Sequence, residues 1–160
     1  MARLGDASYI ERISRLRLQE RDRSVQLAQA FALYRLGRRE FLEAIFQELD
    51  GGEHTQAAAY LLEVEPEDLY PFLQRGSPRA RRAVVEALGR IGSREAIEYL
   101  KPLLRAEDPD LVNATNLAIQ RIERRERAKS AAPEPRTRPR RVGKPNGKPL
   151  APHQQFLSNS

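Results

Sequence analysis

Apolar residues recur at intervals of three and four positions from about residue 7 to about residue 128, the spacing that places them on one face of an α-helix. Segment 78–91 illustrates this, because Ala80, Val84, Ala87 and Leu88 fall on one stripe. Short loops between such segments favour antiparallel neighbours. The expected helices span 7–18, 24–36, 38–49, 54–64, 66–74, 78–91, 93–105 and 109–128.

Residues that favour helix ends stand at several of these boundaries. Ser77 and Asp108 are suited to the N-cap position, and each is followed by a proline, whose missing N–H costs nothing in the first turn. Pro66 has the same role at the start of its segment. Gly37 is suited to the left-handed conformation that ends helix 24–36.

An internal repeat of 31 residues runs through the middle of the chain. Leu-Tyr-Pro-Phe-Leu at 69–73 returns as Leu-Lys-Pro-Leu-Leu at 100–104, and Ala-Leu-Gly-Arg-Ile-Gly at 87–92 returns as Ala-Ile-Gln-Arg-Ile-Glu at 118–123. A forerunner of the second motif lies at 32–37, which is 55 residues earlier than 87–92. Periods of this size indicate stacked helical units. A mid-helix proline kinks a helix, and its return at one repeat position predicts that the kink belongs to the unit.

The segment from Ser77 to Leu100 combines a helix-opening Ser-Pro, an Arg-Arg pair, an Ala-Leu-Gly-Arg-Ile-Gly turn and a following Glu-Ala-Ile helix. This pattern resembles the short HEAT-like repeat first recognised in phycobilisome lyases. The resemblance is good over 77–122, fair over 28–49 and poor over 51–74. The second unit has Val112 and Asn113 where the first has Arg81 and Arg82. Such an arginine usually ties neighbouring units in these repeats, so its absence suits a terminal, capping unit.

The resemblance and the periodicity together predict an all-α fold, a right-handed α-solenoid of about four antiparallel helix pairs over residues 1–128. Residues 32–45 also fit one tetratricopeptide unit. The period of 31 instead of 34 residues, together with the recurring helix-opening proline, favours the HEAT-like alternative.

The net charge of +6 is unevenly distributed. Residues 1–127 hold 21 Lys/Arg and 21 Asp/Glu, whereas residues 128–160 hold 7 Lys/Arg and 1 Asp/Glu. Segment 129–160 is also rich in proline, so we expect a disordered tail. Its function is expected to be electrostatic contact with nucleic acid or an acidic surface, or only solubility. The basic residues concerned are Arg136, Arg138, Arg140 and Arg141.

The composition offers few groups for catalysis. There is no cysteine, and His54 and His153 are the two histidines. His54 follows Glu53 once, without the repeated His-Glu pairs of iron-binding HEAT-like enzymes. We therefore predict no enzyme activity, no cofactor and no metal. No apolar run reaches the length of a signal peptide or a membrane span, so a cytoplasmic protein is expected.

The function implied by the resemblance is binding. In these repeats the second helix of each pair lines the concave face, so partner contacts are expected there from Arg82, Asn116, Gln120 and Arg124. The Arg81–Arg82 pair has a structural alternative, namely bonding to a neighbouring unit. We predict a protein–protein scaffold or adaptor. The alternatives are nucleic-acid binding through the tail and a lyase-like or chaperone-like subunit of an enzyme assembly.

Overall fold

The computed structural model describes residues 4–131, with side chains from residue 7 onward. Within these residues all regular secondary structure is helical, and each of the eight expected helices is present. The α-helices are α1 (Leu4–Gln19), α2 (Arg23–Arg35), α3 (Leu42–Gln47), α4 (His54–Tyr60), α5 (Pro66–Leu69), α6 (Pro78–Ile91), α7 (Ala96–Leu100) and α8 (Pro109–Ala131). The 3₁₀ helices are η1 (Arg39–Phe41), η2 (Leu61–Glu63), η3 (Tyr70–Gln74) and η4 (Lys101–Arg105).

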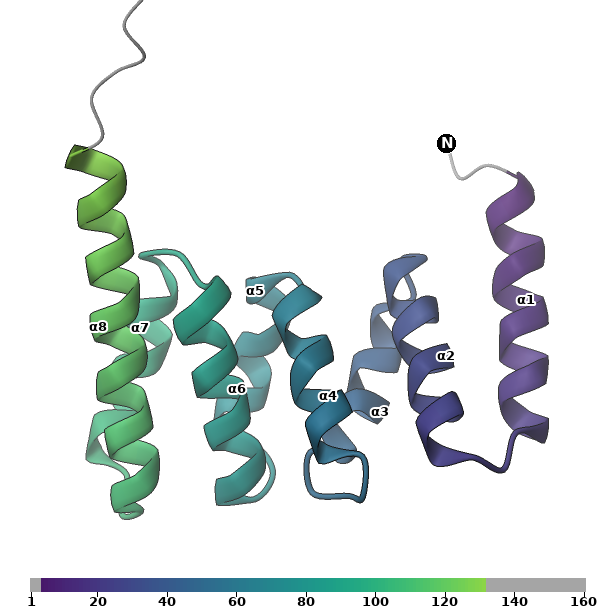
Figure 1. Cartoon of the computed structure of the whole chain (residues 1–160), viewed down its shortest axis with the longest axis horizontal. Helices are drawn as coiled ribbons and strands as arrows, with labels where there is room; N and C mark the ends of the chain where they lie inside the picture. Colours follow the sequence, from purple (N-terminus) through teal and green to yellow (C-terminus); the bar gives the residue numbers. More distant parts are fainter. Residues whose placement is uncertain (1–3, 132–160) are drawn as a thin grey trace, which may run out of the picture.

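The helices form two layers along the longest axis of the molecule (Figure 1). The first layer contains α2, α4, α6 and α8, which stand side by side, and we call it the even layer. The second layer contains α3, α5 and α7 and lies behind the first in this view. Helix α1 stands beside α2 at the end of the row opposite α8 (Figure 1). This alternation of layers is what the short loops and the repeat predict.

The helix ends follow the local chemistry of the sequence. The Ser77 hydroxyl accepts a hydrogen bond from the backbone N–H of Ala80 at 3.0 Å, which confirms it as the N-cap of α6. Gly37 adopts a φ of 91° immediately after α2, the left-handed conformation expected there. The Asp108 carboxylate accepts from the N–H of Asp110 at the start of α8.

The two repeated prolines coincide with a change of helix type. Helix α5 ends at Leu69 and continues as the 3₁₀ helix η3, with Pro71 in its first turn. Pro102 has the same place in η4. A 3₁₀ helix bonds to the third residue back, so a proline there avoids the clash with the carbonyl four residues back. The kink expected from the sequence is therefore a switch from α to 3₁₀ geometry.

One unit of the array is shorter than the others. Helices α2, α4, α6 and α8 begin at residues 23, 54, 78 and 109, which gives intervals of 31, 24 and 31 residues. Helix α4 with η2 ends at Glu63, and Val64 and Glu65 turn the chain directly into α5. The short interval explains why the resemblance is poor over 51–74, and it leaves α4 shorter than both of its neighbours in the even layer.

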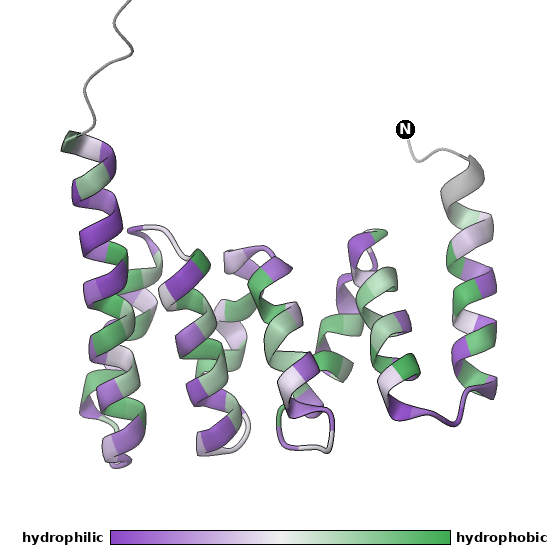
Figure 2. Ribbon diagram, viewed as in Figure 1, coloured by the Kyte–Doolittle hydropathy of each residue, from purple (hydrophilic) through white to green (hydrophobic). Residues whose placement is uncertain are grey.

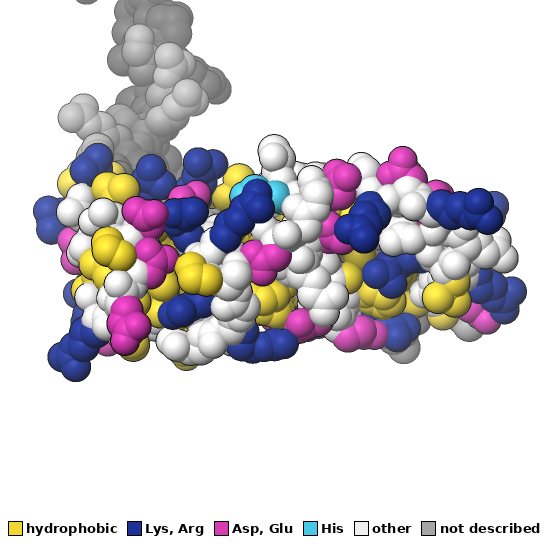
Figure 3. Space-filling view, turned by 90° about the horizontal axis from the view of Figure 1, so that it is seen from below, with side chains coloured by type: hydrophobic (Ala, Val, Ile, Leu, Met, Phe, Trp, Pro, Cys, Tyr) yellow, Lys and Arg dark blue, Asp and Glu magenta, His cyan; other side chains and the backbone are white. Residues whose placement is uncertain are grey.

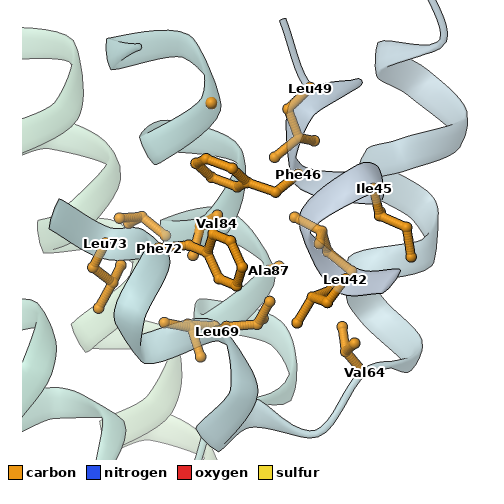
Figure 4. Packing of buried hydrophobic residues seen from close by; sticks show 14 of the residues in the cluster. Leu42, Ile45, Phe46, Leu49, Val64, Leu69, Phe72, Leu73, Val84 and Ala87 are labelled. Atoms are coloured by element: carbon orange, nitrogen blue, oxygen red, sulfur yellow. The ribbon is translucent and has the colours of Figure 1, made fainter. Parts of the chain in front are cut away.

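The core lies between the two layers. Figure 4 shows Leu42 and Phe46 of α3 facing Phe72 of η3, with Val84 of α6 beside them. The rings of Phe46 and Phe72 have their centroids 4.5 Å apart. Leu88 is fully buried, as its stripe predicts. Apolar residues, coloured green on the ribbon, recur in both layers, whereas the C-terminal half of α8 is mainly hydrophilic (Figure 2).

Two details differ from the pattern expected from sequence. Val85 lies outside the apolar stripe of α6 formed by Ala80, Val84, Ala87 and Leu88, but it is also fully buried. It is buried because α6 is covered by α8 as well as by the second layer, so its buried arc is wider than one stripe. In α1, the apolar side chains of Tyr9 and Leu16 are 62% and 50% exposed instead of buried. Helix α1 ends the row and is covered on one side.

Among the described elements, α6 and α8 pack together more extensively than any other pair. A Cβ atom built on Gly89 would lie 2.8 Å from the Cα of Ala118 and 2.9 Å from its Cβ. Only glycine leaves room for this backbone contact. The contact also sets the spacing of the surface side chains on either side of it.

The folded region extends slightly further than expected. Helix α8 continues to Ala131, three residues beyond the predicted boundary at residue 128. The four tail arginines Arg136, Arg138, Arg140 and Arg141 lie outside the described residues.

Replacement of Leu88 by alanine should lower the free energy of unfolding by about 2–5 kcal/mol, because the side chain is fully buried and a cavity would remain. Arg79→Ala on the same helix should change it by less than about 0.5 kcal/mol, because Arg79 is exposed. Urea denaturation followed by circular dichroism measures both values. Equal losses in the two variants would contradict this description of the core.

Gly89→Ala should destabilise the protein even though alanine is favoured over glycine by about 1 kcal/mol in a helix interior. The new methyl group would overlap the backbone of Ala118, so α6 and α8 must separate. Gly52→Ala is the control, because a Cβ on Gly52 meets nothing within 4 Å. Thermal melting compares the two, and an increased Tm for Gly89→Ala would show that the close contact does not constrain the pair.

Candidate functional site

A groove opens between α4 and α6 on the even layer, and we call it the α4–α6 groove. It has a volume of about 270 Å³. Alanines from both helices and Leu62 form its apolar part, and polar side chains stand around it. The short side chains keep the groove open, since alanine fills little of the space between two helices. The lining residues are His54, Thr55, Ala58, Ala59, Leu62, Ala83, Glu86, Ala87 and Arg90.

His54 is the first residue of α4 and is half-buried. Its Nδ1 lies 2.6 Å from the carbonyl oxygen of Leu49, so the ring ties the start of α4 to the end of the preceding unit. No group of three or more His, Cys, Asp or Glu side chains that could hold a metal ion occurs among residues 4–131.

A second groove lies between the C-terminal halves of α6 and α8, and we call it the α6–α8 groove. Its volume is about 440 Å³. Arg90 lines both grooves, so the two are neighbours across α6. The other lining residues include three arginines from one face of α8. The complete lining is Gly89, Arg90, Arg121, Arg124, Arg125 and Ala128.

Arg125 differs from the other arginines of this groove because it is bonded to the protein backbone. Its guanidinium donates to the carbonyl oxygens of Gly89 at 3.2 Å, Arg90 at 2.7 Å and Gly92. These carbonyls lie at the C-terminal end of α6, where the helix dipole favours a positive charge. Arg125 therefore joins α8 to the end of α6. It ties the two units together although Val112 stands at the position where such repeats usually have an arginine.

The remaining three arginines of the α6–α8 groove have no partner within residues 4–131. The side chains of Arg90, Arg121 and Arg124 are exposed and form no hydrogen bond or ion pair there. Several other arginines are paired; Arg39 of η1, for example, lies 2.6 Å from Asp68. We call Arg90, Arg121 and Arg124 the arginine cluster.

The four partner-binding residues expected from sequence do not form one site. Arg82 is half-buried and makes an ion pair with Asp110 of α8 at 3.2 Å, so the structural alternative applies to it. Arg81 is likewise structural, because it donates to the carbonyl oxygen of Leu73. Asn116 is exposed but lines neither groove.

The other two expected residues lie closer to the grooves. Gln120 and Arg124 line a shallow depression on α8 together with Glu123 and Arg127. Arg124 is the only one of the four expected partner-binding residues that also lines the α6–α8 groove.

Sequence reasoning missed Arg90 and Arg121, although a signal for both was present. They are 31 residues apart and occupy the same position of the repeated motifs at 87–92 and 118–123. Equivalent residues of stacked units lie side by side. Arg121, Arg124 and Arg125 are also spaced i, i+3, i+4 and so share one face of α8. The equivalent repeat positions of Arg90 and Arg121, together with the shared face on α8, would have indicated this cluster.

Charge is segregated along the folded part of the chain. Residues 40–74 contain 9 Asp/Glu and no Lys or Arg, whereas residues 75–131 contain 13 Lys/Arg and 8 Asp/Glu. The arginine cluster therefore lies in a basic half that adjoins an acidic middle. The end of the molecule at which the even helices begin has no such segregation, because acidic and basic side chains alternate there (Figure 3).

A further cavity, of about 520 Å³, lies beside the C-terminal end of α8. Its lining includes Ile97 and the ion-paired Glu123 and Arg127, which neutralise each other. It ends at Ala131, the last described residue, so the two grooves on α6 are the better-defined candidate sites.

Comparison with known proteins supports the repeat. Residues 66–130, which run from α5 to α8, match the family model described as HEAT repeats. This agrees with a HEAT-like repeat protein. The fair resemblance over residues 28–49 lies outside the match. No curated protein and no solved structure matches the chain. Among residues 4–131 no helix has both the length and the apolar character needed to cross a bilayer.

Arg125→Ala should lower the free energy of unfolding by about 1.5–3 kcal/mol, because hydrogen bonds from a charged donor to the end of α6 are lost. The neighbouring Arg124→Ala should change it by less than about 0.5 kcal/mol, because Arg124 is exposed and unpaired. Chemical denaturation of both variants tests this difference. If the two variants are equally stable, Arg125 does not join the units.

Proposed function

We propose that the chain is a non-catalytic protein-binding module, a scaffold or adaptor, that seats a segment of another protein in the α4–α6 groove. The observation that carries the proposal is the groove itself, which is apolar along its alanines and bordered by charged residues. This combination is typical of a peptide-binding surface, in which apolar anchors give affinity and a polar rim gives orientation. The match to HEAT repeats supports a protein partner.

The size of the groove supports a side chain as its occupant instead of a cofactor. Sites for drug-sized ligands usually measure about 300–1,000 Å³. The α4–α6 groove, at about 270 Å³, lies below that range. One apolar side chain of a partner, held between Ala59 and Ala83, would occupy much of it. We include no catalytic step and no cofactor in the proposal.

The architecture that we propose around this groove is a right-handed α-solenoid of about four antiparallel helix pairs. The two layers in Figure 1 support it, with α1 and α2 as the first pair. The motif of residues 77–100 supports the phycobilisome-lyase type of short HEAT-like repeat. A subunit of a lyase-like assembly would use the same groove for its companion subunit. If this chain instead binds a tetrapyrrole, the purified protein will absorb visible light.

Filling the groove should abolish its function without unfolding the protein. Ala59 is exposed and lines the groove, so Ala59→Trp should block the apolar part at little cost in stability. The partner is first isolated by its binding to the full chain and then purified. Its affinity for the Ala59→Trp variant should be at least about tenfold lower than for the unmodified chain. This is the loss expected when one apolar anchor that contributes about 1.4 kcal/mol is excluded. Isothermal titration calorimetry measures the affinity.

The matched control is Asn116→Trp, which adds the same side chain at an exposed position of α8 outside both grooves. It should bind the partner with unchanged affinity. If Ala59→Trp binds as tightly as the unmodified chain, the α4–α6 groove is not the docking site. Loss of binding only upon deletion of residues 132–160 would assign the function to the tail.

A further inference from the structure

The arginine cluster brings three unpaired arginines together in one depression. Arg90, Arg121 and Arg124 line one depression of about 440 Å³, are exposed, and have no ion pair among the described residues. Like charges in proximity repel one another, so such a group is most stable when an anion lies among its members. The depression is shared by two helices held together at Gly89 and by Arg125.

We propose that the arginine cluster binds the carboxylates of an acidic segment in the partner protein, next to the apolar residue seated in the α4–α6 groove. The inference rests on the proposed function and adds the chemistry of the partner. Arg90 connects the two sites because it lines both grooves. A segment that leaves the apolar groove on this side passes directly over Arg90 and reaches Arg121 and Arg124.

Arginine suits this role because its planar guanidinium can hold a carboxylate through two parallel hydrogen bonds. A single exposed ion pair contributes little, because water and salt screen it. Three unpaired guanidinium groups in one depression act together on a run of carboxylates. Arg125 contributes positive charge beside them, although its hydrogen bonds go to the backbone of α6.

Charge complementarity excludes the chain's own tail as the occupant, because residues 132–160 carry 6 Lys/Arg and 1 Asp/Glu. A long nucleic-acid backbone fits less well than a short acidic peptide. The basic surface is interrupted by Glu86 beside Arg90 and by Glu123 beside Arg124. The adjoining segment 40–74 would repel an extended polyanion because it holds 9 acidic residues and no basic ones.

The test uses the full chain and two short fluorescein-labelled peptides, each with one leucine. One carries a run of glutamates beside the leucine, and the other has glutamines in their place. Fluorescence anisotropy should show the glutamate peptide binding at least about tenfold more tightly, because bonds to a charged group are worth about 1.5–3 kcal/mol each. Added salt should weaken this preference. Equal affinity for the two peptides would overturn the proposal.

The decisive variant reverses the cluster by Arg90→Glu, Arg121→Glu and Arg124→Glu. Its control makes the same change in net charge at exposed arginines outside both grooves, by Arg79→Glu, Arg94→Glu and Arg105→Glu. The first variant should lose the glutamate peptide and the second should retain it. Equal losses would assign the binding to overall charge or to the tail. If the reversed cluster does not fold, as judged by circular dichroism, the three glutamine substitutions replace it, with the same expected loss.

The variants also separate this proposal from the proposed function. If Ala59→Trp abolishes peptide binding and cluster reversal does not, the α4–α6 groove stands and the arginine proposal is wrong. If cluster reversal abolishes peptide binding and Ala59→Trp does not, the carboxylate site stands and the α4–α6 groove is not the docking site. Tighter binding of a labelled single-stranded oligonucleotide than of the glutamate peptide would overturn the acidic-peptide assignment. So would self-association that disappears on cluster reversal, since the acidic segment of a second copy would then be the occupant.

Discussion

The contact between α6 and α8 is the constraint on which the rest of the surface depends. At Gly89 the two helices approach until the backbone of Ala118 occupies the space of a Cβ atom, and Arg125 closes the end of α6 from the same side. Both interactions come from the part of the chain that matches HEAT repeats. Arg90 and Arg121 occupy equivalent positions of two stacked repeats, so both line the α6–α8 groove.

On its opposite side, α6 faces α4, and there no close backbone contact like that at Gly89 joins the two helices. The interval between α4 and α6 is seven residues shorter than the repeat, and α4 is a short helix with alanines toward α6. Two helices with small facing residues and no interlocking side chain leave a groove. The irregular unit thus creates the apolar site, and the regular unit creates the charged one. Helix α6 belongs to both, which is why we place binding along it.

The sequence predicted the helices well because their causes are local. The apolar stripes, the Ser77 N-cap and the left-handed Gly37 act within a few residues, and all three are present in the structure. The surface was predicted less well because it depends on neighbouring helices. Arg82 was expected to contact a partner, but in the structure it pairs with Asp110 of the next unit. Val85 lies outside the apolar stripe of α6, yet the packing of α8 helps to bury it. Arg90 and Arg121 needed the repeat and the stacking to be considered together.

Binding along α6 can be measured by mapping the backbone amide chemical shifts of the full chain during titration with the leucine–glutamate peptide. We predict that the largest shifts occur in 54–62 of α4–η2, 83–90 of α6 and 121–128 of α8, the segments that line the two grooves. The amides of α1, at the far end of the row, should not move (Figure 1). Shifts confined to residues 132–160 would contradict the central claim that α6 and its two neighbours form the binding surface.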